Sequence, residues 1–141
     1  MINFNLIKLI QNKFFPFYKN SELKFVFKKI QDDFPAKPKK AMFVGGCVRR
    51  YLSNEEIDDI DIATSLTTDQ IKEKFKNTKY NVIETGIKHG TVTLVSDKLK
   101  LELTTLRKDI KTDGRHAEVE YIEDWQKDSE RRDFTINAIY L

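Results

Sequence analysis

Hydrophobic residues recur at helical spacing in one segment near the N-terminus and alternate with polar residues in the middle of the chain. Over 21–34 the apolar positions fall on one side of a helix, which predicts an amphipathic helix there. Over 100–107, Leu101 and Leu103 alternate with polar residues, which predicts a strand with one buried and one polar face. Residues 1–19 favour at most a short amphipathic helix.

Turn and cap residues mark the remaining elements. Strands are expected over 41–44, 59–64, 80–85, 90–95 and 100–107, and helices over 47–52, 67–77 and most of 123–141. Thr67 and Gln70 have the spacing of a capping box at the start of the helix over 67–77. A polar loop is expected over 111–118. This order of strands and helices favours an α+β fold with a mixed sheet.

The length and composition of the chain indicate one soluble globular domain. It has 141 residues, 40% hydrophobic and 33% charged, and a net charge of +3 that permits an anionic partner. One cysteine and two histidines exclude an internal disulfide framework and argue against structural zinc. These counts fit a reducing compartment, so we predict a cytoplasmic location. No apolar run approaches the roughly 18 residues of a membrane span, so no membrane partner is expected.

Acidic residues crowd one short stretch, with five carboxylates between residues 55 and 61. Asp59 and Asp61 would share one face of a strand, and Glu102 lies on the polar face of another. Carboxylate oxygens at this spacing are suitable ligands for Mg²⁺. The alternatives are that the acids form a solvated strand end and that Glu102 pairs with Lys100 at the surface.

A glycine pair, Gly45–Gly46, separates a predicted strand from a predicted helix. Glycine lets a phosphate approach the backbone closely, and a helix start offers free N–H groups to it. Arg49 would add a forked donor for phosphate oxygens. The spacing matches neither a P-loop nor a dinucleotide fingerprint, and a glycine pair alone is also typical of an ordinary turn.

Taken in order, these segments resemble a known family. The stretches FVGGCVRR, DDIDIAT, GIKHGTVTLV, LELTTLR, DGRH and RRDFTINA resemble the head of the class II nucleotidyltransferases, which are CCA-adding tRNA nucleotidyltransferases and bacterial poly(A) polymerases. The resemblance implies an α+β, polymerase β-like head in which a small mixed sheet is flanked by helices. It covers 41–141, preceded by an N-terminal helical extension over 1–40 packed on the head; neck, body and tail domains are not in the sequence.

The resemblance also implies roles for individual residues. The implied catalytic and metal-binding carboxylates are Asp59, Asp61 and Glu102. The implied nucleotide-binding residues are Gly45, Gly46, Arg49, Arg107, Arg131, Arg132, Asp133 and Asn137. Asp113, Gly114 and Arg115 match a flexible loop linked in the family to the switch between C and A addition.

The implied function is Mg²⁺-dependent transfer of a nucleoside monophosphate from CTP or ATP to the 3′-hydroxyl of an RNA. Addition of CCA to the 3′ end of tRNA is favoured over poly(A) synthesis. Arg50 departs from the family, which has an aspartate there, and the chain stops at Leu141 after an apolar run. The alternatives are therefore a fragment that is inactive alone, half of a split enzyme whose second chain supplies neck and body, or a nucleotide- or RNA-binding remnant.

Overall fold

Strands and short helices alternate along the computed structural model, which describes residues 13, 16–31, 38–112, 117–133 and 135–141. The strands are β1 (Ala41–Phe43), β2 (Asp61–Thr64), β3 (Asn81–Gly86), β4 (Thr91–Val95), β5 (Lys100–Thr105), β6 (Arg107–Thr112) and β7 (Ala117–Tyr121). The helices are α2 (Ser21–Gln31), α3 (Gly46–Leu52), α4 (Thr68–Phe75) and α5 (Trp125–Glu130), with 3₁₀ helices η1 (Phe17–Lys19), η2 (Ile87–His89) and η3 (Thr135–Asn137). The α+β class predicted from the sequence is confirmed.

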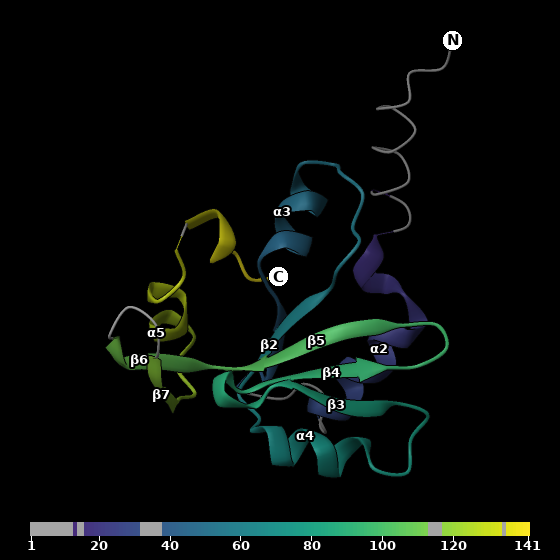
Figure 1. The fold of residues 1–141 in the computed structure, drawn as a ribbon. Helices are drawn as coiled ribbons and strands as arrows, with labels where there is room; N and C mark the ends of the chain where they lie inside the picture. The colour runs from purple at the N-terminus through teal and green to yellow at the C-terminus, as the bar shows by residue number, and fades with distance from the viewer. Residues whose placement is uncertain (1–12, 14–15, 32–37, 113–116, 134) are drawn as a thin grey trace.

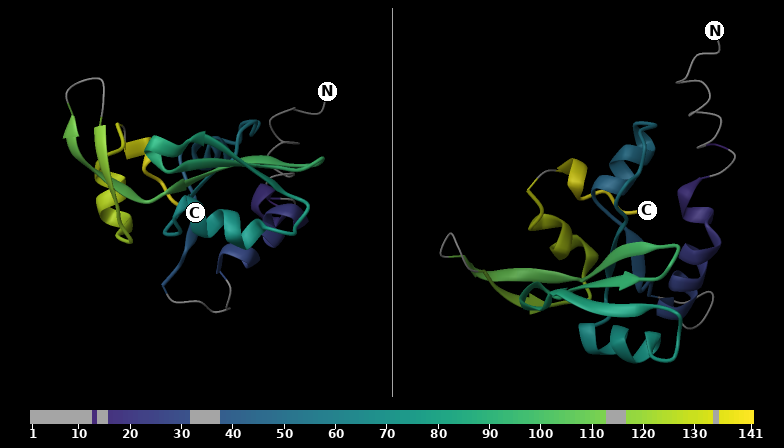
Figure 2. Two further views of the ribbon diagram at one scale, coloured as in Figure 1. Left: turned by 60° about the horizontal axis from the view of Figure 1, so that its bottom comes forward. Right: turned by 45° about the vertical axis from the view of Figure 1, so that its right-hand side comes forward.

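Five strands form one mixed sheet in the order β1–β2–β5–β4–β3 (Figure 1). β2 and β5 run parallel, while the other neighbouring pairs are antiparallel. The parallel register pairs Asp61 with Glu102, and side chains in register on neighbouring strands point to the same face. The sheet therefore carries these two acids to one place. β6 and β7 form a separate hairpin that extends from one end of the molecule (Figure 2).

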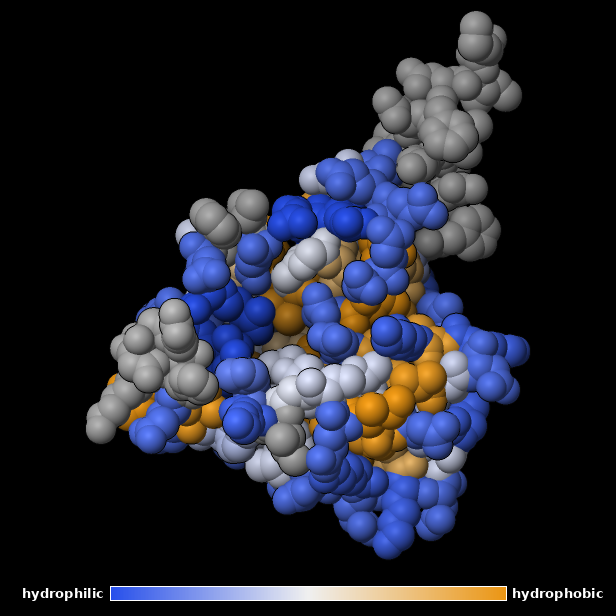
Figure 3. All heavy atoms as spheres, in the orientation of Figure 1, coloured by the Kyte–Doolittle hydropathy of each residue, from blue (hydrophilic) through white to orange (hydrophobic). Residues whose placement is uncertain are grey.

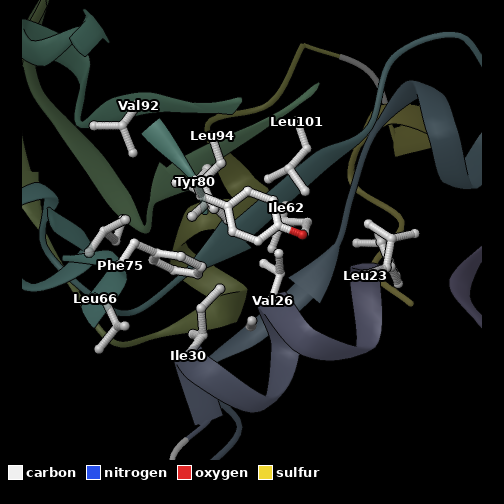
Figure 4. Packing of buried hydrophobic residues seen from close by; sticks show 14 of the residues in the cluster. Leu23, Val26, Ile30, Ile62, Leu66, Phe75, Tyr80, Val92, Leu94 and Leu101 are labelled. Atoms are coloured by element: carbon white, nitrogen blue, oxygen red, sulfur yellow. The ribbon is translucent and has the colours of Figure 1, made fainter. Parts of the chain in front are cut away.

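Helices α2 and α4 pack under one face of the five-stranded sheet (Figures 1 and 2). Val26 and Ile30 of α2, Phe75 of α4, and Leu94 and Leu101 of the sheet lie in this core, each at most 1% exposed (Figure 4). Burying a side chain of this size contributes about 1.5–3 kcal/mol. Because both helices lie on this face, the opposite face of the central strands is left to polar residues.

A second, smaller cluster lies at the end of the sheet near α5. Val44, Ala63 and Leu106 are buried there, and the rings of Trp125 and Tyr140 pack edge to face with centroids 5.6 Å apart. The last residues of the chain lie along β1, since Val44 and Tyr140 form a bridge. This pairing places Tyr140 beside α5.

Local signals predicted several elements correctly. The capping box of α4 is present: the Thr67 hydroxyl accepts from the Gln70 N–H, and the Gln70 side chain accepts from the Thr67 N–H. Helix α2 is present over Ser21–Gln31, and β5 alternates buried and more exposed residues as expected. None of the helices in the described part of the chain has the length and hydrophobicity needed to cross a bilayer.

Three predicted boundaries were wrong. β2 begins at Asp61, so Asp59 precedes the strand. The expected loop over 111–118 is shortened at both ends by β6 and β7. The expected helix over most of 123–141 is reduced to α5 and the single turn η3, because the apolar residues that follow pack on β1 and on the second cluster. The pairing of the C-terminal residues with β1 joins distant parts of the chain, so no local pattern in the sequence indicates it.

Candidate active site

A cavity of about 330 Å³ opens between the start of α3, the adjoining ends of β4 and β5, and the residues that follow α5. Its lining residues are Val44, Gly45, Asp61, His89, Thr91, Thr104, Arg107, Arg131 and Arg132. The deepest blue, most hydrophilic spheres in Figure 3 gather in two places, between α5 and the central strands, in this region, and over α3. Five of the sequence-predicted residues thus meet in one cavity: the first glycine of the pair, one carboxylate and three arginines.

One of the three predicted carboxylates lines this cavity, and a second is its neighbour in the sheet. Asp61 lines the cavity, and Glu102 is its partner across the parallel strands. The Glu102 N–H donates to the Ile60 carbonyl at 2.9 Å, so the pairing continues toward Asp59. Burial, followed by the charges of Glu102 and Asp59, raises the pKa of Asp61 above its usual value, and Arg132 opposes this shift. Glu102 and Asp59 therefore act electrostatically on Asp61.

These acids offer hard oxygen ligands, which is the donor chemistry that Mg²⁺ prefers. Within the described residues, no three side chains of His, Cys, Asp or Glu are already close enough to form a complete metal site. Asp61 nevertheless carries a charge that burial and two like-charged neighbours disfavour. A bound divalent cation would relieve that cost, so the chemistry of the donor set fits a hard cation.

The glycine pair forms a bend beside Asp61. Gly45 has a φ of +74°, a conformation that side chains rarely adopt, and a Cβ there would lie 3.8 Å from Asp61 Oδ2. A Cβ on Gly46 would meet no atom within 4 Å. The backbone is thus open at the start of α3. Arg49, one turn further, donates from Nη1 to Asn137 Oδ1 at 2.7 Å, which joins two other predicted residues.

Three arginines give the cavity its positive side. Arg107 donates to the His89 carbonyl, while its buried Nε has no hydrogen-bond partner among the described residues. Burial and the neighbouring charge of Arg131 lower the pKa of Arg107. Arg131 and Arg132 are both largely buried, with side chains 13% and 17% exposed. Guanidinium groups held in this way are suited to phosphate oxygens.

Sequence reasoning missed two residues that contact these arginines, Asp128 and Tyr140. Asp128 is fully buried and forms ion pairs with Arg131 at 2.8 Å and with Arg132 at 3.0 Å. Burial alone would raise the pKa of Asp128, but the Tyr140 hydroxyl, the Arg107 N–H and both arginines together lower it. The helical spacing of Asp128 to the arginines, three and four residues, was the available signal. Nothing local indicated Tyr140.

Other predicted residues lie outside the cavity lining. Asp59, Glu102 and Asp133 are exposed. Asp113, Gly114 and Arg115 lie outside the described residues, so the structure does not place that predicted loop. His89, Thr91 and Thr104 line the cavity without having been predicted. For Thr91 and Thr104 the signal would have been the polar side of β4 and β5, the face that carries Glu102. His89 lies in η2, where no such alternation marks it.

Arg50, the departure from the family pattern, is not among the residues that line the cavity. Its Nη1 donates to Asp58 Oδ2 at 2.6 Å and to the Glu56 carbonyl at 3.1 Å. The Glu55 N–H in turn donates to the Arg50 carbonyl at 2.8 Å. Arg50 therefore fastens the acidic segment that precedes Asp59 to α3.

Known proteins match the chain over the same region. Residues 41–141 match the family described as the poly A polymerase head domain. The human mitochondrial CCA tRNA nucleotidyltransferase 1 is 51% identical over 98 residues, which cover 69% of this chain and 23% of that protein. The CCA-adding enzyme of Listeria monocytogenes EGD-e is 45% identical over 108 residues, covering 72% of this chain and 25% of its own length. The chain thus spans about a quarter of these relatives.

Solved structures share the fold. A Bacillus stearothermophilus CCA-adding enzyme in complex with CTP superposes with a TM-score of 0.67 at 33% identity, over 86% of this chain and 28% of that chain. A tRNA nucleotidyltransferase complexed with a primer tRNA and an incoming ATP analog gives a TM-score of 0.54 at 32% identity, over 72% of this chain and 27% of that chain. The mixed sheet and its helices therefore recur in proteins that bind these ligands.

Proposed function

Because the chain belongs to the poly A polymerase head domain family, we propose that it is the head of a template-independent RNA nucleotidyltransferase. It would transfer a nucleoside monophosphate from CTP or ATP to the 3′-hydroxyl of an RNA and release pyrophosphate. The observation that carries this proposal is the cavity in which Gly45 and the arginines 107, 131 and 132 lie beside Asp61. It combines groups for a triphosphate with a carboxylate for its metal ion.

Addition of CCA to tRNA is our preferred form of this reaction over poly(A) synthesis. The similar curated proteins are named CCA tRNA nucleotidyltransferase or CCA-adding enzyme. Two similar solved structures hold CTP, or a primer tRNA with an ATP analog. These ligands support CTP, ATP and the tRNA 3′ end as partners of this chain. The choice of base remains a proposal, since the chain spans about a quarter of these proteins.

The acidic and the basic residues of the site would have different roles. We propose that Asp59, Asp61 and Glu102 hold Mg²⁺. When bound, this cation would neutralise phosphate charge and lower the pKa of the attacking hydroxyl. Asp61 lies in β2 beside the glycine bend, so the proposed metal ligand is next to the start of α3. The open backbone at Gly46 would receive phosphate oxygens.

The arginines would bind the triphosphate from the other side of the cavity. Arg131 and Arg132 present forked donors there, and Arg107 adds a buried Nε that has no partner among the described residues. Arg49 is held by Asn137 and would bind phosphate at the start of α3. We propose that Asp133, which is exposed just after Arg132, contacts the nucleotide at the rim. Asp113, Gly114 and Arg115 remain proposed as the loop linked to the change from C to A addition.

Labelling of RNA tests the proposal. The 141-residue chain is mixed with labelled CTP or ATP, Mg²⁺ and tRNA lacking its CCA end, and incorporation and nucleotide binding are both measured. Asp61→Asn should abolish incorporation, while Asp97→Asn, which removes the same charge from an exposed turn, should not change it. Binding of nucleotide without incorporation would favour the binding remnant. Inactivity that is rescued by a second polypeptide with neck and body would favour the split enzyme. Absence of both binding and incorporation would refute the proposal.

The cytoplasmic location predicted from the cysteine and histidine counts stays a proposal. The human relative has the word mitochondrial in its name, and other relatives are bacterial. Fractionation of cells that express a tagged chain would test it.

A further inference from the structure

Asp128 is a fully buried carboxylate in which both oxygens are engaged. Oδ1 accepts from the Arg107 N–H at 3.0 Å and from Arg131 Nε at 2.9 Å. Oδ2 accepts from the Tyr140 hydroxyl at 2.6 Å and from Arg132 Nη2 at 3.0 Å. A buried charge is tolerated when it is paired and hydrogen-bonded in this way. Each oxygen thus accepts from the side chain of one arginine, Oδ1 from Arg131 and Oδ2 from Arg132.

Each of the two arginines is also held by a second acceptor. Arg131 Nε donates to the Arg107 carbonyl at 3.1 Å. Arg132 Nε donates to the Tyr140 oxygen at 3.1 Å, and its guanidinium lies 5.5 Å from the centre of the Tyr140 ring. The side chain of arginine is long and loses rotamer entropy when it is fixed. Here both guanidinium groups are hydrogen-bonded to acceptors of the protein itself.

We propose that Asp128 is a positioning residue: it orders Arg131 and Arg132 in advance for the phosphate groups of the nucleotide, and the Tyr140 hydroxyl reinforces the half that holds Arg132. This inference rests on the proposed function for its ligand. Neither residue touches the ligand itself. Asp128 lies behind the arginines, and its contacts set the direction from which they face the cavity.

A simpler role for Asp128 would be to neutralise charge. The three arginines of the cavity carry three positive charges, and Asp128 compensates one of them. If neutralisation were its only role, removing the carboxylate charge would strengthen the attraction for a triphosphate. Positioning predicts the opposite sign, because arginines released from Asp128 must be ordered again when the ligand binds. The two roles can therefore be separated by the direction of one change.

Asp128→Asn provides this test, because it removes the charge and nearly keeps the volume. Binding of Mg·CTP and Mg·ATP to the full chain, measured by calorimetry, should weaken by about tenfold or more, the scale of one lost hydrogen bond to a charged group. Tyr140→Phe leaves the charge unchanged and should weaken binding by about threefold, the scale of one ordinary hydrogen bond. Unchanged or tighter binding by Asp128→Asn would overturn the proposal.

Asp124→Asn is the matched control. It removes the same charge from the same helix, and asparagine keeps the cap because Asp124 Oδ1 only accepts, from the N–H groups of Gln126 and Lys127. Its nucleotide affinity should stay that of the natural chain. If Asp124→Asn weakens binding as much as Asp128→Asn does, the effect does not depend on the contacts between Asp128 and the arginines, and the positioning role is refuted.

A readout without nucleotide separates this inference from the proposed function. In protein labelled with ¹⁵N-arginine, the Nε–H groups of Arg131 and Arg132 should exchange slowly with water, since both are hydrogen-bonded. Asp128→Asn should speed up both, while Tyr140→Phe should act mainly on Arg132. Failure of the natural chain to bind nucleotide would refute the proposed function alone. Unchanged exchange in a folded Asp128→Asn would refute the positioning role alone.

Discussion

Gly90 lies between two lining residues of the cavity, and replacing it by alanine should damage the fold in a way that can be divided into two parts. Its φ is +70°, and a Cβ there would lie 2.6 Å from Tyr121 Cε1 and 3.2 Å from Thr105 Cβ. The backbone conformation alone costs about 1–2 kcal/mol for a residue with a side chain. Overpacking costs about 1–3 kcal/mol more. The free energy of unfolding should therefore fall by about 2–5 kcal/mol in total.

Urea unfolding followed by the fluorescence of Trp125, the single tryptophan, measures this loss. Tyr121→Ala removes the closest of the atoms that the new Cβ would meet and leaves the Thr105 Cβ, so the double variant should recover most of the overpacking part and keep the backbone part. The double-mutant cycle then gives a coupling of about 1–3 kcal/mol. Gly46→Ala is the matched control, since its Cβ would meet no atom within 4 Å at the first residue of α3. It should be neutral or slightly stabilising.

Two results would refute this reasoning. A loss below about 0.5 kcal/mol for Gly90→Ala, the range of ordinary surface changes, would mean that neither the backbone nor the contact is as described. Failure of Tyr121→Ala to recover any of the loss would mean that the hairpin of β6 and β7 does not pack against the η2 turn. In either case the positions of His89 and Thr91 in the cavity would be in doubt.

Three further changes test the charges of the site. Asp61→Asn should raise the free energy of unfolding in EDTA at pH 7, by about 1 kcal/mol for a like-charge contact in a partly solvated site. The reason is that burial, followed by the neighbouring carboxylates, raises the pKa of Asp61 and so disfavours its charge. A lower urea midpoint than that of the natural chain, with the midpoint of Asp97→Asn unchanged, would contradict this prediction. Arg50→Asp should lower the free energy of unfolding only slightly, since the pair with Asp58 is exposed, with side chains 38% and 63% accessible. The exchange of both residues should restore part of this loss, and a double-mutant cycle with no coupling would reject the pair. The lowered pKa of Asp128 means that its contribution to stability is complete above the unfolded pKa and is lost as pH falls through the folded one. Urea midpoints should therefore decline less steeply below pH 4 in Asp128→Asn, and identical acid limbs would argue against the paired carboxylate.

Hydrophobic periodicity was sufficient for the elements that pack on the core. Helices α2 and α4 each place apolar residues on one side, and β5 alternates, so each records in its own sequence which face is buried. The hairpin of β6 and β7 escaped prediction because its strands are mostly polar and lie outside the main sheet, so no buried face marks them. The same reasoning explains the C-terminal segment, whose partner is β1 rather than its own helix.

The residues of the site differ in the same way: those with a local signal in the sequence were predicted, and those placed only by long-range contacts were not. Asp61, Glu102 and the glycine pair were found from residue type and local spacing, but the parallel pairing of β2 with β5 that joins the two acids is a long-range contact. Asp128 carried a weak local signal in its spacing to the arginines. Tyr140 carried none, because its role depends on the return of the chain to β1. The residues that hold the arginines were therefore harder to predict than the residues that would touch the ligand.

Asp61 and Asp128 differ in whether an arginine pairs with them, and this difference explains why Arg132 and Asp61 can share one site without neutralising each other. Direct pairing of Arg132 with Asp61 would neutralise both groups and leave neither for a cation or a phosphate. Asp128, fully buried, accepts from Arg132 at 3.0 Å instead, so Arg132 only partly offsets the shift that raises the pKa of Asp61. The ionised form of Asp61 therefore stays unfavourable, because burial and two neighbouring acids disfavour its charge. Asp128→Asn should then release Arg132 toward Asp61 and lower the pKa of Asp61, which titration of its carboxyl carbon by NMR would detect. An unchanged pKa would show that Arg132 has no access to Asp61 and that the separation does not depend on Asp128.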